Sequence, residues 1–428
     1  MIEAPQILCV GDIHLGRRPR RLPDNLADWG HNLSDFTPVS AWRATVDYAV
    51  AQKVNAVLLA GDVVQSDNQY YEAFGPLDQG VRKLVDHGIS VYAVAGNHDV
   101  EVLPRLADDI DGFHLLGPDG TWEETVLEHE GKPFLRLAGW SFPTKHVTTN
   151  PLIGLQVSFP DTLPVVGLVH CDLDVHNSQY APVASGDLKR TGYSAWLLGH
   201  IHTPSTFAQE KPVGYLGSLV GLDPTETGLH GPWLMTVSDT ELPMAQVATS
   251  PLRWEHIVLP VDAVGEPGEL DALLSGALAD LHGRLTGTLG DARAVGVRIT
   301  LTGRSSSCRA LEAHLRDSDP TPLRRELGGV LYFVDKVQSR MLPALDLQAI
   351  ARQDDPPGLL ARKLLRLETP EGDPLVQEAM DAMQQETQRS RWQPLGAEPI
   401  TPEMVKDQLR NSGIYALQEL LAQQEPAP

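Results

Sequence analysis

The chain has 428 residues, 42% of them hydrophobic, and a formal net charge of −22 at pH 7. This length exceeds what one hydrophobic core sustains, so we expect two or three domains. The acidic charge opposes non-specific attraction to nucleic acid, and the three widely spaced cysteines exclude a disulfide framework or a C-x-x-C motif.

The first part of the chain alternates short buried strands with helical patterns. Strands are predicted at 6–10, 55–60 and 89–95, where apolar and β-branched residues run together. Helices are predicted at 40–53 and 70–88, where apolar residues recur at helical spacing. This βαβαβ order implies a largely parallel sheet.

Five further strands are predicted in the following segment. They lie at 133–139, 163–170, 193–200, 212–218 and 232–237. Turn residues rather than long helices separate them. We therefore expect an α/β fold, a layered sandwich of sheets flanked by helices, with a more antiparallel second half.

The pattern changes near residues 250–262, where we place a domain boundary. Helix and strand patterns then alternate at 269–285, 294–303, 308–317 and 329–341. They predict a smaller α+β domain that is close to neutral, with arginine as nearly all of its cations. Polar helical patterns separated by Pro and Gly follow and predict a helical tail. The predicted domains are therefore 1–250, 251–350 and 351–428.

No targeting signal or membrane span is predicted. The start of the chain has no basic flank and no small-residue cleavage site. No apolar run approaches the ~18 residues of a spanning helix. We therefore expect a soluble cytoplasmic protein.

Metal-capable side chains follow five of the predicted strands. Each lies just past the carboxyl end of its strand, the edge at which open α/β sheets bind ligands. They are Asp12 and His14, then Asp62, then Asn97, His98 and Asp99, then His170, and finally His200 and His202. Taken alone, the pair His200 and His202 would more simply be explained as surface residues or hydrogen-bonded core residues. The recurrence at five strand ends favours a metal site instead.

The residue types indicate the chemistry of such a site. Carboxylate, amide and imidazole donors suit Mn²⁺, Fe or Zn²⁺ with room for water, and without cysteine they disfavour a closed structural zinc site. Seven of these nine side chains would already be too many ligands for one such ion, and they are enough for two ions that share a carboxylate. Two ions about 3.5–4 Å apart can generate a hydroxide at neutral pH and clamp both oxygens of a displacement at phosphorus.

The series D-x-H, GD, GNHD, H and GHxH resembles the signature of the calcineurin-like metallophosphoesterases. The resemblance implies two groups of metal ligands. One ion would be held by Asp12, His14 and His202, the other by Asn97, His170 and His200, with Asp62 bridging them.

The resemblance also implies roles for the two remaining residues of the GNHD motif. His98 would contact the phosphate and protonate or stabilise the leaving oxygen without binding a metal. Asp99 would orient His98 by a hydrogen bond, the usual role of a carboxylate beside a histidine.

Within that superfamily the chain is most similar to the SbcD-like DNA repair exonucleases, including the YhaO type. DIHLGR at 12–17, the segment around Tyr180–His200 and GYLGSLVGLDPTETGLHG at 214–231 carry this resemblance. It implies a Mn²⁺-dependent DNA exonuclease or endonuclease with a DNA-guiding capping domain. It also implies an SbcC-like coiled-coil ATPase as partner, bound by the tail, and leaves a homodimer open.

Gln65 in GDVVQ stands where many relatives have His or Asp, a departure that concerns substrate handling rather than metal binding.

A basic stretch follows the first motif of the site. It consists of Arg17, Arg18, Arg20 and Arg21. In an otherwise acidic domain these arginines are either a solvated loop or a contact for nucleic-acid phosphates.

Two other functions stay open at this point: a small-molecule phosphodiesterase or phosphomonoesterase on the same metal core, and a non-catalytic scaffold.

Overall fold

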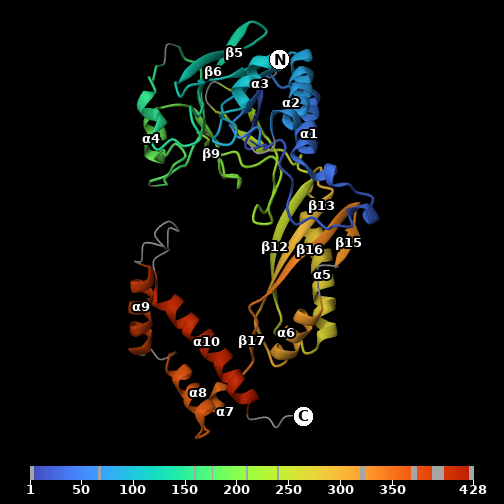
Figure 1. Cartoon of the computed structure of the whole chain (residues 1–428), viewed down its shortest axis with the longest axis vertical. Helices are drawn as coiled ribbons and strands as arrows, with labels where there is room; N and C mark the ends of the chain where they lie inside the picture. Colours follow the sequence, from blue (N-terminus) through green and yellow to red (C-terminus); the bar gives the residue numbers. More distant parts are fainter. Residues whose placement is uncertain are drawn as a thin grey trace. The chain divides into compact units, whose positions relative to one another are not determined.

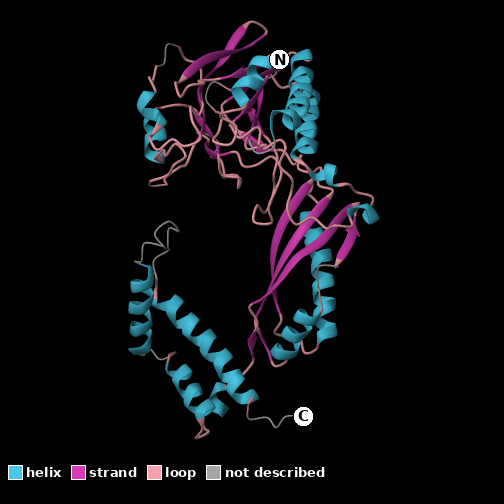
Figure 2. Ribbon diagram, viewed as in Figure 1, coloured by secondary structure: helices cyan, strands magenta, loops and turns pink. Residues whose placement is uncertain are grey.

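The computed structural model describes most of the chain. The described residues are 4–65, 69–158, 161–175, 177–208, 211–238, 241–318, 323–367, 374–387 and 400–423. Figure 1 gives the element labels, and Figure 2 shows the distribution of helix and strand.

A six-stranded sheet forms one layer of the N-terminal fold, with the strand order β11-β10-β1-β2-β3-β4. Its strands are β1 (Gln6–Val10), β2 (Ala56–Leu59), β3 (Ser90–Ala93), β4 (Phe113–Leu115), β10 (Trp233–Thr236) and β11 (Met244–Gln246). β1 to β4 pair in parallel, and β10 pairs antiparallel with β1. The predicted parallel βαβαβ arrangement is confirmed.

A five-stranded sheet forms the second layer, with the order β5-β6-β7-β8-β9. Its strands are β5 (Glu123–His129), β6 (Lys132–Trp140), β7 (Val165–His170), β8 (Ala195–Gly199) and β9 (Val213–Tyr215). β5 and β6 form an antiparallel hairpin, but β6 to β9 pair in parallel. The expected antiparallel character is therefore wrong for this sheet, because long loops return the chain to the same end between strands.

The two sheets enclose the core of this part of the chain. Ile7 and Cys9 of β1 pack in a cluster with residues of the second sheet such as Leu168 and Leu197. Leu8 and Val10, which alternate with them, pack on the helical side. That side is covered by α1 (Pro38–Gln52), α2 (Gln69–Asp86) and α3 (Leu103–Asp109), and α4 (Ser185–Arg190) flanks the second sheet.

Short 3₁₀ helices occur within the connections of this fold. They span Leu26–Trp29, Leu33–Phe36 and Pro151–Gly154. The first two lie between β1 and α1, in the long loop that begins with the basic stretch. This loop therefore has local structure of its own.

A four-stranded sheet follows, with the order β12-β13-β16-β15. Its elements, in chain order, are β12 (Leu252–Pro260), α5 (Pro267–Leu285), β13 (Ala294–Thr302), β14 (Arg304–Ser305), α6 (Cys308–Asp317), β15 (Arg324–Leu327), β16 (Val330–Ser339) and β17 (Leu342–Pro343). β14 and β17 form a separate parallel pair. β12 occupies the stretch where the sequence analysis places only a boundary.

The tail is helical, as predicted. It contains α7 (Leu347–Ile350), α8 (Pro356–Arg366), α9 (Pro374–Thr387) and α10 (Pro402–Ala422). Asp355 caps α8 by accepting from the Gly358 N–H, and Thr401 caps α10 in the same way. The helices share a core that includes Leu364, Ile414 and Leu417. The fold class as a whole is confirmed.

The chain divides into two compact units. One comprises Met1–His256, Leu278–Arg298 and Thr321–Asp335, and the other Ile257–Ala277, Ile299–Pro320 and Lys336–Pro428. The domain ranges predicted from the sequence stay a prediction. Within the described residues, no helix combines the length and the apolar character needed to cross a bilayer.

Candidate dimetal site at the strand ends

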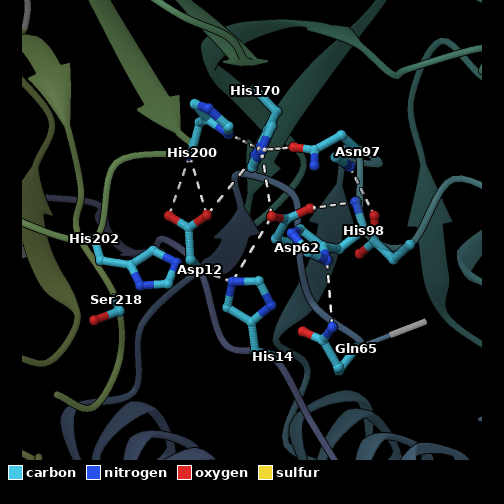
Figure 3. A network of polar contacts seen from close by, with 12 residues as sticks. Asp12, His14, Asp62, Gln65, Asn97, His98, His170, His200, His202 and Ser218 are labelled. Atoms are coloured by element: carbon cyan, nitrogen blue, oxygen red, sulfur yellow. Dashed lines mark hydrogen bonds and ion pairs between the residues drawn. The ribbon is translucent and has the colours of Figure 1, made fainter. Parts of the chain in front are cut away.

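The predicted metal ligands meet at the carboxyl ends of strands from both sheets. Asp12 follows β1, Asp62 follows β2, His170 ends β7 and His200 directly follows β8, as Figure 3 shows. Asn97 follows β3 in the same cluster. Asp12 and His170 are fully buried, and Asp62 is 2% exposed. Carboxylates buried to this degree need compensating partners.

The ligands fall into two groups. In each group, one candidate donor atom per residue lies within 4.8 Å of the others. The groups are Asp12, His14 and His202, and Asp62, His170 and His200. Asp62 also stands between them, because its Oδ2 lies 3.7 Å from His14 Nε2 and 3.5 Å from His170 Nε2.

Three of these residues have an unusual backbone conformation. His14, Asp62 and His200 have φ values of 54°, 48° and 106°. This region is uncommon for residues other than glycine, and it costs of the order of 1–3 kcal/mol each. Hydrogen bonds hold the turns in place: the Asp62 carbonyl accepts from the N–H groups of Ile13, at 3.1 Å, and His14, at 2.9 Å.

In three histidines, the ring nitrogen that faces away from the other candidate ligands lies beside a hydrogen-bond acceptor. His170 Nδ1 lies 3.1 Å from the Ala60 carbonyl oxygen. His200 Nε2 lies 3.1 Å from Asp172 Oδ1, and His202 Nδ1 lies 2.8 Å from Glu226 Oε1. Each acceptor requires the proton on the ring nitrogen that faces it. The other nitrogen of each neutral ring then presents a lone pair to the interior of the site.

When the rings of His170 and His200 are neutral, these lone pairs converge with no hydrogen between them. His170 Nε2 lies 3.3 Å from His200 Nδ1 and 3.1 Å from the Asn97 side-chain oxygen. Three acceptors facing one another repel, whereas a cation among them is coordinated by all three. Burial also lowers the pKa of His14 to about 3, which keeps that ring neutral and able to bind a metal. The donor set therefore fits divalent metal ions.

Asp99 does not make the hydrogen bond that the family resemblance implies. Its Oδ2 accepts from the Val63 N–H at 2.6 Å, and its Oδ1 accepts from the Gly96 N–H at 2.7 Å. Among the described residues, no hydrogen bond joins this carboxylate to the His98 ring. Asp99 is saturated by backbone donors, so it ties the loop after β2 to the loop after β3.

The Gln65 side chain contacts the His98 ring, which also packs edge-to-face against the His14 ring with the centroids 5.2 Å apart. The Gln65 amide nitrogen lies 3.3 Å from His98 Nδ1. The backbone N–H of His98 donates to Asp62 Oδ1 at 2.9 Å, which attaches His98 to the cluster of candidate metal ligands. Burial lowers the pKa of His98. The departure from the family pattern at Gln65 thus lies beside His98.

A cavity of about 560 Å³ adjoins His98. Its lining residues are Gly16, Arg17, Arg18, Arg20, Gln65, Glu72 and His98. Three of the four arginines in the basic stretch therefore face the same space as His98. Arg21 is exposed and is not part of this lining. The cavity combines positive charge with a histidine next to the metal ligands.

The sequence analysis missed Asp172 and Glu226. Asp172 lies two residues after His170, and that proximity is the signal that could have indicated it. Glu226 lies in the 214–231 stretch used for the family resemblance, but no spacing rule relates it to His202. Both are 8% exposed.

Comparisons with known proteins agree with this site. Residues 5–204 match the model of the calcineurin-like phosphoesterase family. The chain is 28% identical over 226 residues to the uncharacterized metallophosphoesterase YhaO of Bacillus subtilis, covering 51% of this chain and 54% of that protein. It is 26% identical over 281 residues to the DNA double-strand break repair protein Mre11 of Aeropyrum pernix, covering 62% of this chain and 65% of that protein.

Both matches span less than two thirds of the relative's own length. Among solved structures, a dimetal phosphatase from Danio rerio is similar at 12% identity with a TM-score of 0.37, covering 58% of this chain and 97% of that one. The motifs, the convergent ligands and the family match concern the same segment. Residues 5–204 of this chain are similar to the calcineurin-like phosphoesterase family.

Proposed function

We propose that this protein is a two-metal phosphodiesterase that cleaves DNA. The observation that carries the proposal is the cavity lined by His98 and three arginines, directly beside the convergent metal ligands. Phosphodiester substrates need positive charge near the reacting phosphorus, and this cavity supplies it within an acidic chain.

The metal ions have a defined place in this proposal. Two divalent ions, for which we propose Mn²⁺, would be held by Asp12, His14, Asp62, Asn97, His170, His200 and His202. When bound, they supply Lewis acidity and an activated water for attack on phosphorus. The remaining steps depend on the protein's own side chains.

His98 acts on the leaving oxygen. The Gln65 amide donates to Nδ1 of His98, which places the proton of the neutral ring on Nε2. His98 Nε2–H then donates a hydrogen bond to the oxygen that departs from phosphorus and stabilises the charge developing there. Because Gln65 is uncharged, it does not favour the imidazolium form as an aspartate would.

The arginines bind the phosphates on either side of the cleaved bond. Arg17, Arg18 and Arg20 present guanidinium groups, which pair with phosphate in a bidentate manner. The similarity to Mre11 supports DNA as the source of these phosphates. A single small ester would leave part of this charge without a partner.

The cellular setting extends the proposal. We propose that the segment 251–350 guides the DNA strand and that the tail at 351–428 binds an SbcC-like coiled-coil ATPase. That partner would supply access to duplex ends, because an acidic chain gains little from bulk attraction to DNA. The proposed setting is cytoplasmic DNA repair.

The test is hydrolysis of end-labelled single- and double-stranded DNA beside bis-p-nitrophenyl phosphate, with Mn²⁺, Mg²⁺ or chelator. We expect Mn²⁺-dependent DNA cleavage that falls about 10²–10⁴-fold in His98→Ala. His114→Ala is the matched control, because His114 is exposed on β4 and stacks on Tyr92 away from the site. Product lengths from each labelled end distinguish exonuclease from endonuclease action.

Other outcomes would redirect the assignment. Cleavage of the small ester without DNA would indicate a small-molecule phosphodiesterase on the same core. No turnover of any phosphate ester with Mn²⁺ would indicate a scaffold. DNA cleavage that persists in pure His98→Ala would remove His98 from the mechanism.

A further inference from the structure

We propose that Glu226 and Asp172 are positioning residues, each of which aligns the histidine of one metal group. Glu226 acts on His202, and Asp172 acts on His200. The two histidines belong to different groups of candidate ligands, so the two ions have separate supporting carboxylates. This inference rests on the proposed dimetal function but not on DNA as the substrate.

Glu226 is held by hydrogen bonds to both of its oxygens. Oε1 accepts from His202 Nδ1 at 2.8 Å, and Oε2 accepts from the Leu222 N–H at 2.9 Å. The Ser218 hydroxyl lies 3.2 Å from Oε2 as well. With both oxygens engaged, the carboxylate has one orientation, and it fixes the proton of His202 on Nδ1. His202 Nε2 then faces the site with its lone pair, 3.0 Å from His14 Nε2.

The segment that carries Glu226 is itself anchored. His230, 1% exposed, lies with Nε2 3.2 Å from the Glu226 carbonyl oxygen and Nδ1 3.0 Å from the Ser218 carbonyl oxygen. On the other side, the Trp254 indole donates to the Gly221 carbonyl at 3.1 Å. The carboxylate is therefore positioned before an ion binds, as a supporting residue requires.

Asp172 supports His200 in a different way. Its Oδ1 lies 3.1 Å from His200 Nε2, and its Oδ2 accepts from the Ser178 hydroxyl. The proton of His200 is thereby fixed on Nε2, and Nδ1 faces His170. A hydroxyl can rotate to accept a hydrogen bond, whereas the Leu222 N–H behind Glu226 cannot.

This difference predicts unequal effects of amide substitution. In Glu226→Gln, one carbonyl oxygen cannot accept from both His202 Nδ1–H and Leu222 N–H, so an amide NH₂ faces one of the donors. In Asp172→Asn, the oxygen can remain on His200 while the new NH₂ donates to Ser178. We therefore expect Glu226→Gln to lower the metal affinity of its group more than Asp172→Asn lowers the affinity of the other group. Asp172→Ala removes the acceptor altogether, so it should lower the affinity of that second group as strongly as Glu226→Gln lowers the first.

The experiment is calorimetric titration of the metal-free full chain with Mn²⁺, with electron paramagnetic resonance of the same samples. We expect two ions in the wild type and a spin-coupled pair signal. In Glu226→Gln and in Asp172→Ala, one ion should keep its affinity and the other should bind about 10–100-fold more weakly. At one equivalent, an isolated Mn²⁺ signal should replace the coupled one. Asp223→Asn is the matched control, because this acid lies in the same segment and bonds Thr225 rather than a histidine.

The outcomes separate the two proposals. Two ions of unchanged affinity in Glu226→Gln would overturn the positioning role and leave the proposed function intact. A wild type that binds no Mn²⁺ would overturn the proposed function, and this inference with it.

A measurement on the unaltered sequence remains decisive if a variant fails to fold. Nitrogen-15 spectra of the metal-free wild type at pH 9, with the His202 ring assigned through its backbone resonances, should show the His202 proton on Nδ1. A proton on Nε2 would contradict the role of Glu226.

Discussion

A methyl group added at Gly199 would clash with both the backbone after β2 and the ring of His170, a candidate metal ligand. The Cβ of an alanine there would lie 2.0 Å from the Ala60 carbonyl oxygen and 2.7 Å from His170 Nδ1. Those two atoms form a hydrogen bond of 3.1 Å, so the methyl group cannot be accommodated without separating them. Overpacking costs about 1–3 kcal/mol, and a lost hydrogen bond costs about 1 kcal/mol. We expect Gly199→Ala to lower the free energy of unfolding by about 2–4 kcal/mol.

The assay is thermal unfolding by calorimetry in the presence of a chelator, so that metal binding does not contribute. Gly276→Ala is the control for the same chemical change: Gly276 is exposed in α5, and nothing lies within 4 Å of the added carbon. A helical site of that kind should gain about 0.5–1 kcal/mol. Mn²⁺ titration should also show a weaker ion in Gly199→Ala, because His170 turns away. Wild-type unfolding and wild-type Mn²⁺ affinity in Gly199→Ala would refute the reasoning.

Four further predictions follow from the same structure. Excess Mn²⁺ should stabilise the protein against heat, by about 2.7 kcal/mol at 100 times the dissociation constant, and chelator should reverse the effect in a thermal melt. Arg18→Ala should weaken DNA binding and reduce the slope of log affinity against log salt by about 1, measured by fluorescence anisotropy. Burial, with the nearby Glu124, raises the pKa of Tyr193 to about 12. The unfolded chain therefore loses this proton first, stability falls from pH 10 to pH 12, and Tyr193→Phe should flatten that decline in urea titrations. Trp254→Ala should cost about 3–5 kcal/mol in the same urea assay at neutral pH, because the fully buried indole packs in the core and bonds Gly221.

The sequence predicts the buried strands well because burial inside the fold requires runs of apolar residues. The strand predicted at 6–10 is β1, and the strand predicted at 294–303 is β13, shorter by one residue. Both segments are largely apolar, and most of their residues are buried. The same logic locates the ligands, because carboxyl ends of parallel strands share an edge and polar side chains there have few other roles.

Features that depend on pairing between distant segments were not predictable in this way. Strand β12 alternates buried and half-buried residues only in its first half, so its pattern resembles a connection. Strand direction in the second sheet depends on the end of the sheet to which each loop returns the chain. The turn residues in the sequence do not indicate that end. The family resemblance implied a hydrogen bond from Asp99 to His98, but the two oxygens of Asp99 accept from the backbone N–H groups of Val63 and Gly96 instead. Hydrogen-bond partners of that kind require coordinates.

The backbone strain at three of the candidate ligands has a consequence for how this site would bind a metal. His14, Asp62 and His200 would each relax toward ordinary backbone angles if the turns were free. The strained angles are retained because hydrogen bonds fix the turns. The Asp62 carbonyl accepts from two N–H groups, and the His200 N–H donates to Asp12 Oδ1 at 3.0 Å. The donor atoms are therefore arranged by the fold rather than gathered by the ion. Variation in metal affinity should then come mainly from residues that hold the ligands, such as Glu226, because there is little ligand rearrangement left for the ion to drive.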